Sequence, residues 1–258
     1  MLTGATGGLG VAIGEAMAAA GASLVLSARD EAALRSLAAR LPGEEHRVLA
    51  ADLGEPGAAA ELIRRAGPLD VVVANAGLSG SGRIERFDPE RIELTTRVNL
   101  EAPIQLFAAA LPAMRSAGRG QLVAITSLND KFAPPLATLY CATKFGLRGF
   151  CMSLREELHG SGVGVSVVAP GFVRDAGMFH ASGAKAPLIV GSATPAEVGA
   201  AVVRSIAADV AEIEVAPRRQ RLGTAFAHRY PRLSARFTRK ASVELAERVA
   251  AGQSERGE

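Results

Sequence analysis

The 258-residue chain contains no tryptophan, two tyrosines and two cysteines. The cysteines, Cys141 and Cys151, lie ten residues apart in a segment expected to be helical. A rise of 1.5 Å per residue separates them by about 15 Å, which excludes a disulfide between them. They belong to no cluster with metal-ligand spacing. We therefore predict a reducing compartment, the cytoplasm, and no metal site.

Long apolar runs and a strong excess of one charge are also missing. No run approaches the roughly 20 apolar residues of a membrane-spanning helix, and no signal-peptide pattern is present. The formal net charge is only +3, although the pI is about 9.2. The basic residues are spread along the chain, which argues against nucleic acid as a partner. With 48% hydrophobic residues, a chain of this length can bury one substantial core.

Short apolar strands alternate with amphipathic helices along most of the chain. This alternation predicts one α/β domain, a parallel sheet with helices on both faces. Strands are expected at 23–27, 47–51, 69–74, 121–126, 163–169 and 212–216. Helices are expected at 11–20, 31–40 (capped by Asp30), 55–65, 139–159 and 195–208, with long helical segments within 86–114.

Residues 172–194 lack regular periodicity. A loop of this length inside a compact domain is usually a lid or a binding loop. Its apolar content suggests an apolar substrate.

The chain opens with the glycine-rich stretch Thr3-Gly4-x-x-x-Gly8-x-Gly10. Glycines in such a loop allow a tight turn and let backbone N–H groups approach a pyrophosphate at the start of a helix. An ordinary glycine-rich turn between a strand and a helix is the alternative interpretation.

Only Met1 and Leu2 precede this loop, whereas a phosphate-binding loop normally follows a complete strand. We therefore expect that translation starts upstream and that the cellular protein carries about five to fifteen further residues. If the chain starts at Met1, we expect low stability and weak cofactor affinity.

Ala28 and Arg29 follow the strand expected at 23–27. At this place a nucleotide-binding fold often has an acid that binds the ribose 2′-OH. Without that carboxylate, a 2′-phosphate could pair with Arg29, so the sequence favours NADP over NAD. A solvated charge at the start of a helix is the alternative role for Arg29.

Tyr140 and Lys144 lie four residues apart, which places them on one face of a helix. An ammonium beside a phenol favours the phenolate, so we expect the pKa of Tyr140 to fall from about 10. Tyr140 could then serve as the proton donor to a carbonyl oxygen. Ser127 stands at the carboxyl end of the strand expected at 121–126, where α/β proteins hold their active sites. Asn99, a mediocre helix former in the middle of a helix, indicates a special role.

The segment from Arg218 to Lys240 contains eight basic residues and no acidic one. Apolar residues recur in it at three- or four-residue steps, namely Leu222, Phe226, Tyr230, Leu233 and Phe237, although Pro231 must interrupt the helix. Two interpretations remain open: peripheral contact of 218–240 with an anionic membrane, or packing against the domain or a dimer partner.

Together, TGATGGLG, ANAG, Asn99, Ser127, Tyr140 and Lys144 resemble the single-domain branch of the short-chain dehydrogenase/reductase family. The resemblance covers residues 1–216 and leaves 217–258 as a basic amphipathic extension. It implies a Rossmann-type, doubly wound parallel sheet of seven strands in the order 3-2-1-4-5-6-7. It also implies NAD(P)-dependent interconversion of a carbonyl compound and an alcohol by a homodimer or homotetramer.

The resemblance assigns roles to individual residues. Tyr140 would be the acid/base, Ser127 would bind the substrate oxygen, Lys144 would hold the nicotinamide ribose and Asn99 would anchor a water. The implied cofactor-binding residues are Gly4, Thr6, Gly8, Leu9, Gly10, Arg29, Asp52, Leu53, Asn75, Ala76, Gly77, Tyr140, Lys144, Pro170, Gly171 and Val173.

Two positions depart from the family pattern. Asp175 stands where a cofactor-contacting Thr is common, and its carboxylate would be unfavourable near phosphates unless Arg174 offsets it. Ala74 replaces the first Asn of an NNAG turn. The sequence favours an NADP(H)-dependent reductase or dehydrogenase acting on a small apolar or lipid-like molecule. A non-catalytic NADP-binding regulator or scaffold is the alternative.

Overall fold

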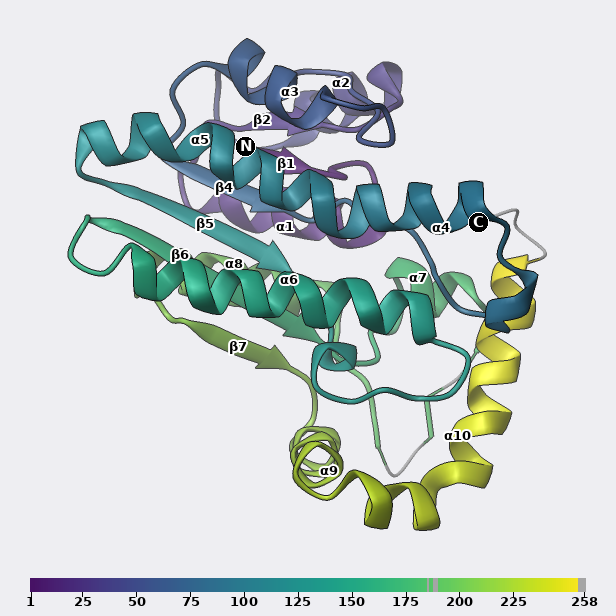
Figure 1. Cartoon of the computed structure of the whole chain (residues 1–258). Coiled ribbons are helices and arrows are strands. Elements are labelled where there is room, and N and C mark those ends of the chain that lie inside the picture. The colour runs from purple at the N-terminus through teal and green to yellow at the C-terminus, as the bar shows by residue number, and fades with distance from the viewer. Residues whose placement is uncertain (185, 188–189, 255–258) are drawn as a thin grey trace.

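The computed structural model describes residues 1–184, 186–187 and 190–254, with side chains described except at 237–242 and 253–254. The strands are β1 (Leu2–Thr3), β2 (Val25–Ser27), β3 (Arg47–Val48), β4 (Val71–Ala74), β5 (Gly120–Ile125), β6 (Val163–Pro170) and β7 (Glu212–Val215). They form one all-parallel sheet in the order β3-β2-β1-β4-β5-β6-β7 (Figure 1). The predicted fold class and strand order are confirmed.

Ten α-helices fall within the described ranges. They are α1 (Gly8–Ala19), α2 (Glu31–Arg40), α3 (Ala58–Ala66), α4 (Pro89–Thr96), α5 (Ala102–Ala117), α6 (Thr138–Glu157), α7 (Gly177–Ala181), α8 (Pro195–Ala207), α9 (Arg218–Arg229) and α10 (Pro231–Ser254). Three shorter segments are the 3₁₀ turns η1 (Ile84–Arg86) and η3 (Leu128–Asp130) and the π-helical turn η2 (Arg97–Glu101).

The sheet separates two apolar cores. Helices α3, α5 and α6 cover one face, where Leu62, Phe107 and Leu122 are buried together. Helices α1, α2 and α8 cover the other face, and Figure 1 shows α5 and α6 crossing the near face with α1 and α8 behind. Successive side chains of a strand point to opposite faces, so Val72 enters the first core and Val73 the second. The strands are therefore buried on both sides, as the near-continuous apolar runs predict.

The two residues of β1 lie at the centre of the sheet. Leu2 pairs with Leu26 of β2 on one side and with Val73 of β4 on the other. The backbone nitrogen of Met1 donates a hydrogen bond of 2.6 Å to the carbonyl oxygen of Val71. The loop that follows β1 is thereby placed at the carboxyl edge of the sheet, next to the loop after β4.

Several boundaries differ from the sequence-based expectation. Strand β3 is shorter than 47–51, and α3 starts at Ala58 rather than at residue 55 because Gly57 takes a positive φ of 77°. The helical region 86–114 is divided by the π-helical turn. Within the expected loop 172–194, residues Gly177–Ala181 form the short helix α7, while 185, 188 and 189 lie outside the described residues.

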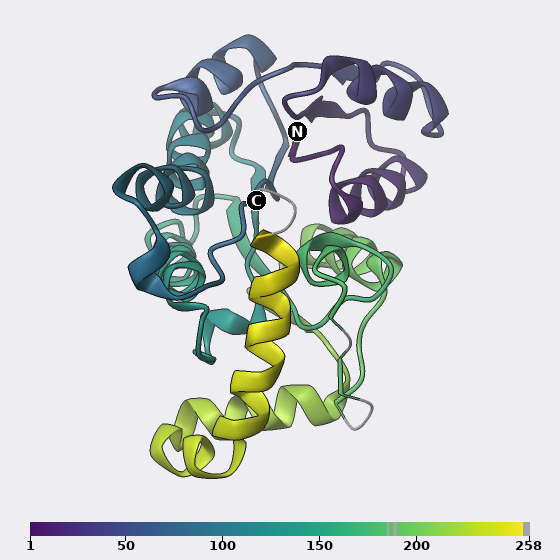
Figure 2. The ribbon, with the colours of Figure 1, turned by 90° about the vertical axis from the view of Figure 1, so that its right-hand side faces the viewer.

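The basic segment forms two helices that meet at Pro231, as its position predicts. Figure 2 shows α9 running across the lower end of the molecule and α10 rising from it along the body. His228 Nδ1 lies 3.1 Å from the carbonyl oxygen of Lys131, and Arg221 Nε donates to Glu214 Oε2 at 3.2 Å. Helix α9 is thus fastened to the domain. No helix in the described ranges is both long and apolar enough to span a membrane.

Candidate active site

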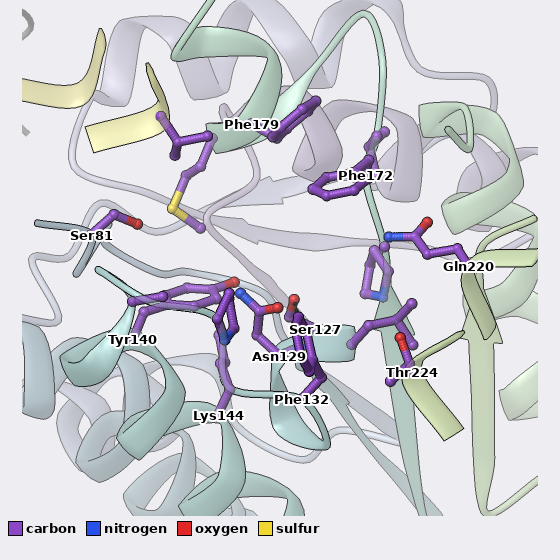
Figure 3. Close-up of a pocket in the computed structure, with 18 of the residues that line it drawn as sticks. Ser81, Ser127, Asn129, Phe132, Tyr140, Lys144, Phe172, Phe179, Gln220 and Thr224 are labelled. Atoms are coloured by element: carbon purple, nitrogen blue, oxygen red, sulfur yellow. Dashed lines mark hydrogen bonds between the residues drawn. The ribbon is translucent and has the colours of Figure 1, made fainter. Parts of the chain in front are cut away.

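A cavity of about 510 Å³ lies at the carboxyl ends of the central strands. Ser127, two residues past the end of β5, faces Tyr140 and Lys144 on the first turns of α6 (Figure 3). Most of the remaining wall is apolar and includes Phe132, Phe172, Phe179, Met178, Leu245 and Val249. The structure therefore brings together three of the four residues assigned catalytic roles from the sequence.

Lys144 is held in place by the end of the neighbouring strand. Its side chain is only 3% exposed, and Nζ donates a hydrogen bond of 3.0 Å to the carbonyl oxygen of Ile125. Nζ lies 5.6 Å from the centroid of the Tyr140 ring, as the helical spacing predicts. Burial disfavours the ammonium and lowers the pKa of Lys144 to about 8.

The expected lowering of the Tyr140 pKa is wrong for this arrangement of side chains. Burial of the phenol raises its pKa to about 12, and a hydrogen bond with the Ser127 side chain only partly offsets that rise. The negative charge of Asp130 also raises the pKa of Tyr140, and the charge of Lys144 is itself disfavoured by burial. Tyr140 is neutral at physiological pH and can donate its proton.

Asp130, which sequence reasoning missed, lies directly behind this group. It is 1% exposed at the end of η3, and its Oδ2 accepts a hydrogen bond of 2.7 Å from the Thr126 hydroxyl. Its Oδ1 is buried and accepts no hydrogen bond from any described residue. Burial raises the pKa of Asp130 to about 6, and its negative charge acts on both Tyr140 and Lys144. No pattern in the sequence singled it out.

Lys131 and its acidic partners on β7 fix the segment that carries Ser127. Lys131 Nζ lies 2.6 Å from Glu212 Oε1 and 2.5 Å from Glu214 Oε1. Arg148 of α6 donates two hydrogen bonds of 3.0 Å to the two carboxylate oxygens of Glu212. The loop after β5 and helix α6 are thereby tied to the edge strand and, through His228, to α9.

Asn99 is buried within the π-helical turn and does not line the cavity. Its Oδ1 accepts from the Leu78 backbone N–H at 2.7 Å, and its Nδ2 donates to the Leu78 carbonyl at 2.9 Å. The side chain therefore holds the loop after β4 against α6. π-Helical turns shift backbone groups out of the normal helical pattern and often occur at functional sites.

The glycine-rich loop after β1 has the backbone that pyrophosphate binding requires. Gly4 has a φ of 62°, and a Cβ on Gly10 would lie 2.0 Å from the carbonyl oxygen of Gly4. The N-cap residue of α1 is Gly7, which has no side chain to accept from the first N–H groups. These groups are thus available for an anion at the positive end of the helix dipole, so this loop fits the phosphates of a dinucleotide.

The loop after β4 is fastened to this glycine-rich loop. Asn75 Nδ2 donates hydrogen bonds to the carbonyl oxygens of Thr3 at 3.0 Å and Gly4 at 3.1 Å. The Thr3 hydroxyl accepts from the backbone N–H groups of Asn75 and Ala76. A Cβ on Gly77 would lie 3.9 Å from Lys144 Nζ, so this loop runs from the phosphate-binding loop to the catalytic group.

The remaining predicted cofactor residues surround the same edge of the sheet. Arg29 is exposed after β2, Asp52 Oδ1 accepts from Gly54 N–H at 2.8 Å, and Leu53 is buried in the first core. Residues at the end of β6 and on the loops line the cavity, including Leu9, Asn75, Gly77, Pro170, Gly171 and Val173.

The departure at Asp175 is compensated locally. Asp175 has a φ of 68° and pairs with Arg174, with Oδ2 and Nε 3.4 Å apart. Both side chains are more than half exposed, so the pair is screened by solvent. Neither residue is among those that line the cavity.

Comparisons with known proteins agree on one family. The family model for short chain dehydrogenases matches residues 1–187. The chain is 34% identical over 221 residues to the ketoacyl reductase HetN of Nostoc. This match covers 83% of this chain and 77% of that protein. The chain is 36% identical to the mouse dehydrogenase/reductase SDR family member 7B over 67% of this chain, and spans 57% of that longer protein.

A solved structure of a metagenomic short-chain oxidoreductase in complex with NADP is similar in fold, with a TM-score of 0.70. It is 32% identical in sequence, and the match covers 84% of this chain and 95% of that structure.

Asp130 predicts a pH-dependent stability. The unperturbed pKa of an Asp carboxyl is 3.8, whereas the pKa of Asp130 in the fold is about 6. The folded protein therefore binds this proton more tightly than the unfolded chain does. Ionisation of Asp130 therefore lowers the free energy of unfolding as the pH rises from 3.8 through about 6. Above that range the decrease reaches about 3 kcal/mol. Asp130→Asn keeps an acceptor for Thr126 and cannot ionise. We expect the variant to be more stable than the wild type at about pH 8 and to lose that advantage near pH 4.

Urea unfolding at both pH values measures this difference. The exposed Asp70→Asn is the matched control, with a small effect on the free energy of unfolding. If Asp130→Asn is less stable than the wild type at pH 8, the raised pKa assigned to Asp130 is contradicted.

Proposed function

This chain belongs to the short-chain dehydrogenase/reductase family, oxidoreductases that act on CH–OH and C=O groups, and from that premise we propose that it interconverts a ketone or aldehyde and an alcohol on a small apolar or lipid-like molecule with NADP(H). The observation that carries the proposal is the grouping of Ser127, Tyr140 and the buried Lys144 at one end of an apolar cavity.

The lining of the cavity supports an apolar substrate. Aromatic and aliphatic side chains come from four separate segments: the loop after β5, the loop after β6, α7 and α10. Phe172 and Phe179 pack against each other with ring centroids 4.6 Å apart. Polar groups stand at the catalytic end and on α9, where Gln220 and Thr224 line the cavity. The apolar side chains between them suit a molecule with one reacting oxygen and a largely apolar body.

The chain's own residues would handle the proton and the orientation of the substrate. Bound NADPH supplies the hydride for the carbonyl carbon. Tyr140 Oη–H donates its proton to the carbonyl oxygen as the C=O π bond breaks, and Ser127 orients that oxygen. The carbonyl compound is reduced to the alcohol, the nicotinamide is oxidised, and Tyr140 recovers a proton from solvent. The Lys144 ammonium would lie beside the nicotinamide ribose and stabilise the transient phenolate.

The glycine-rich loop, with Gly4, Thr6, Gly8, Leu9 and Gly10, would hold the pyrophosphate at the N-terminus of α1. Asp52 and Leu53 would contact adenine, and Asn75, Ala76 and Gly77 would flank the ribose. Pro170, Gly171 and Val173 would contact the nicotinamide. Asn99 would act through the π-helical backbone, because its side chain is engaged by Leu78.

We also propose that residues 1–216 form the catalytic domain, that 217–258 form an extension and that the protein assembles as a homodimer or homotetramer.

Tyr140→Phe tests the proposed acid. Removing the hydroxyl removes the proton donor, and we expect the turnover number to fall by a factor of about 10² to 10⁴. NADPH affinity should change little, because the ring remains. Tyr230→Phe is the matched control, since Tyr230 is the other tyrosine in the chain and is exposed. The assay is NADPH oxidation over a panel of apolar ketones and aldehydes.

Turnover retained in Tyr140→Phe would refute the role of Tyr140. Wild-type protein that binds NADPH but turns over no member of the panel would favour the alternative, a non-catalytic NADP-binding regulator or scaffold.

Arg29 tests the choice of cofactor. If its guanidinium pairs with the 2′-phosphate, Arg29→Ala should weaken NADPH binding about tenfold and leave NADH binding nearly unchanged. Arg35→Ala is the control, an exposed arginine on α2 that pairs with Glu31 at 2.5 Å. Nicotinamide fluorescence is the readout, because the chain contains no tryptophan. Tighter binding of NADH than NADPH by the wild type, or an unchanged ratio in Arg29→Ala, would overturn the NADP preference.

A further inference from the structure

Helix α9 has two faces with different surroundings. Gln220, Gly223, Thr224 and Ala227 recur at three- and four-residue steps and line the catalytic cavity. Figure 3 shows Gln220 and Thr224 at the cavity from that side. This inner face explains why α9 packs on the domain, and it leaves the opposite face directed away from the cavity.

The opposite face is apolar and exposed. On α9, Leu222 is 71% and Phe226 43% exposed. Tyr230, between the two helices, is 50% exposed, and Leu233 of α10 is 46% exposed. We call these four side chains the elbow patch. The Phe226 and Tyr230 rings lie 5.5 Å apart, so the patch is continuous across the turn between the helices. Seven large hydrophobic side chains are exposed in the described part of the chain, and four of them are gathered here.

The elbow patch is surrounded by positive charge. Arg218, Arg229, Arg232 and Arg236 are all exposed, and the Arg229 guanidinium lies 5.4 Å from the centroid of the Tyr230 ring. The segment 218–240 contains no acidic residue that could neutralise them. Apolar side chains with arginines around them match a surface that offers anionic headgroups above an apolar interior.

The patch also lies at an extremity of the molecule. Figures 1 and 2 both show α9 and the start of α10 at the lower end, away from the helices that flank the sheet. The contacts of His228 with Lys131 and of Arg221 with Glu214 fix α9 in this orientation. The patch is therefore presented outward by a helix that is already docked.

We propose that the elbow patch docks on an anionic lipid surface, with Leu222, Phe226 and Leu233 entering the interface and the arginines contacting headgroup phosphates. A second copy of the chain fits the patch less well. A two-fold symmetric contact would place the same arginines of both copies against each other, with no acidic side chain of this segment to pair with them. Docking through α9 would place one wall of an apolar cavity against the bilayer, where apolar substrates concentrate. The proposal concerns binding alone and holds whether or not the chemistry is as proposed above.

Sedimentation with vesicles tests the proposal on the full chain. We expect the wild type to sediment with phosphatidylcholine vesicles that contain phosphatidylglycerol, and much less with phosphatidylcholine alone. Higher salt should weaken the binding because surface charges are screened. The double variant Leu222→Ser/Phe226→Ser should bind at least about tenfold more weakly, since it removes two large apolar side chains from the interface.

Ile84→Ser/Ile92→Ser is the matched control, because both side chains are exposed outside the patch. It should bind vesicles like the wild type. Circular dichroism and NADPH binding check that both variants remain folded. A second pair, Arg232→Glu/Arg236→Glu, should lose binding to the anionic vesicles without loss of apolar side chains.

Three results would overturn the proposal. One is a wild type that does not sediment with anionic vesicles, and another is equal binding by the patch and control variants. The third is a patch variant that alters the oligomeric mass in light scattering while vesicle binding stays unchanged, which would assign the patch to a second copy of the chain.

Discussion

The hydrogen bond from the buried Lys144 ammonium to the Ile125 carbonyl joins the catalytic helix to the central sheet. An ammonium in a poorly solvated position requires such an acceptor, because a buried charge without a partner is costly. The bond fixes the first turns of α6 against the end of β5, and with them Tyr140 beside Ser127. Asn99 holds the loop after β4 and also contacts Thr143 of this helix, while Lys131 ties the loop after β5 to β7 and Arg148 ties α6 to β7. The shape of the cavity thus depends on where α6 meets β5.

The cavity is completed by segments that are distant in sequence. The glycine-rich loop and the loop after β4 offer backbone groups on the side suited to a dinucleotide, where Asn75 bonds to Thr3 and Gly4. The loop after β6, α7 and the two C-terminal helices provide the apolar walls. The arginine-rich helix α9 thus borders both the cavity and the outer surface.

Local patterns predicted much of this arrangement. The spacing of apolar residues predicted the strands and helices. The i, i+4 spacing predicted that Tyr140 and Lys144 lie together on one helix face. The strand order came from the family resemblance. The direction of the Tyr140 pKa shift was wrong, because desolvation depends on the tertiary cover of the phenol. Asp130 was missed for the same reason, since its burial follows from packing against α6 and β7 rather than from its neighbours in sequence. The short helix α7 and the inner face of α9 likewise depend on contacts that no local window contains.

Burial of the phenol keeps Tyr140 a neutral proton donor. In the Tyr230→Phe variant Tyr140 is the sole tyrosine, and without tryptophan its ionisation can be followed by absorbance near 295 nm. A pH titration of the folded variant, with folding monitored by circular dichroism, measures the pKa directly. We expect the titration midpoint of Tyr140 to lie well above the ordinary tyrosine pKa of about 10. A midpoint between about 8 and 9 in folded protein would show that the Lys144 charge outweighs desolvation, and would contradict this expectation.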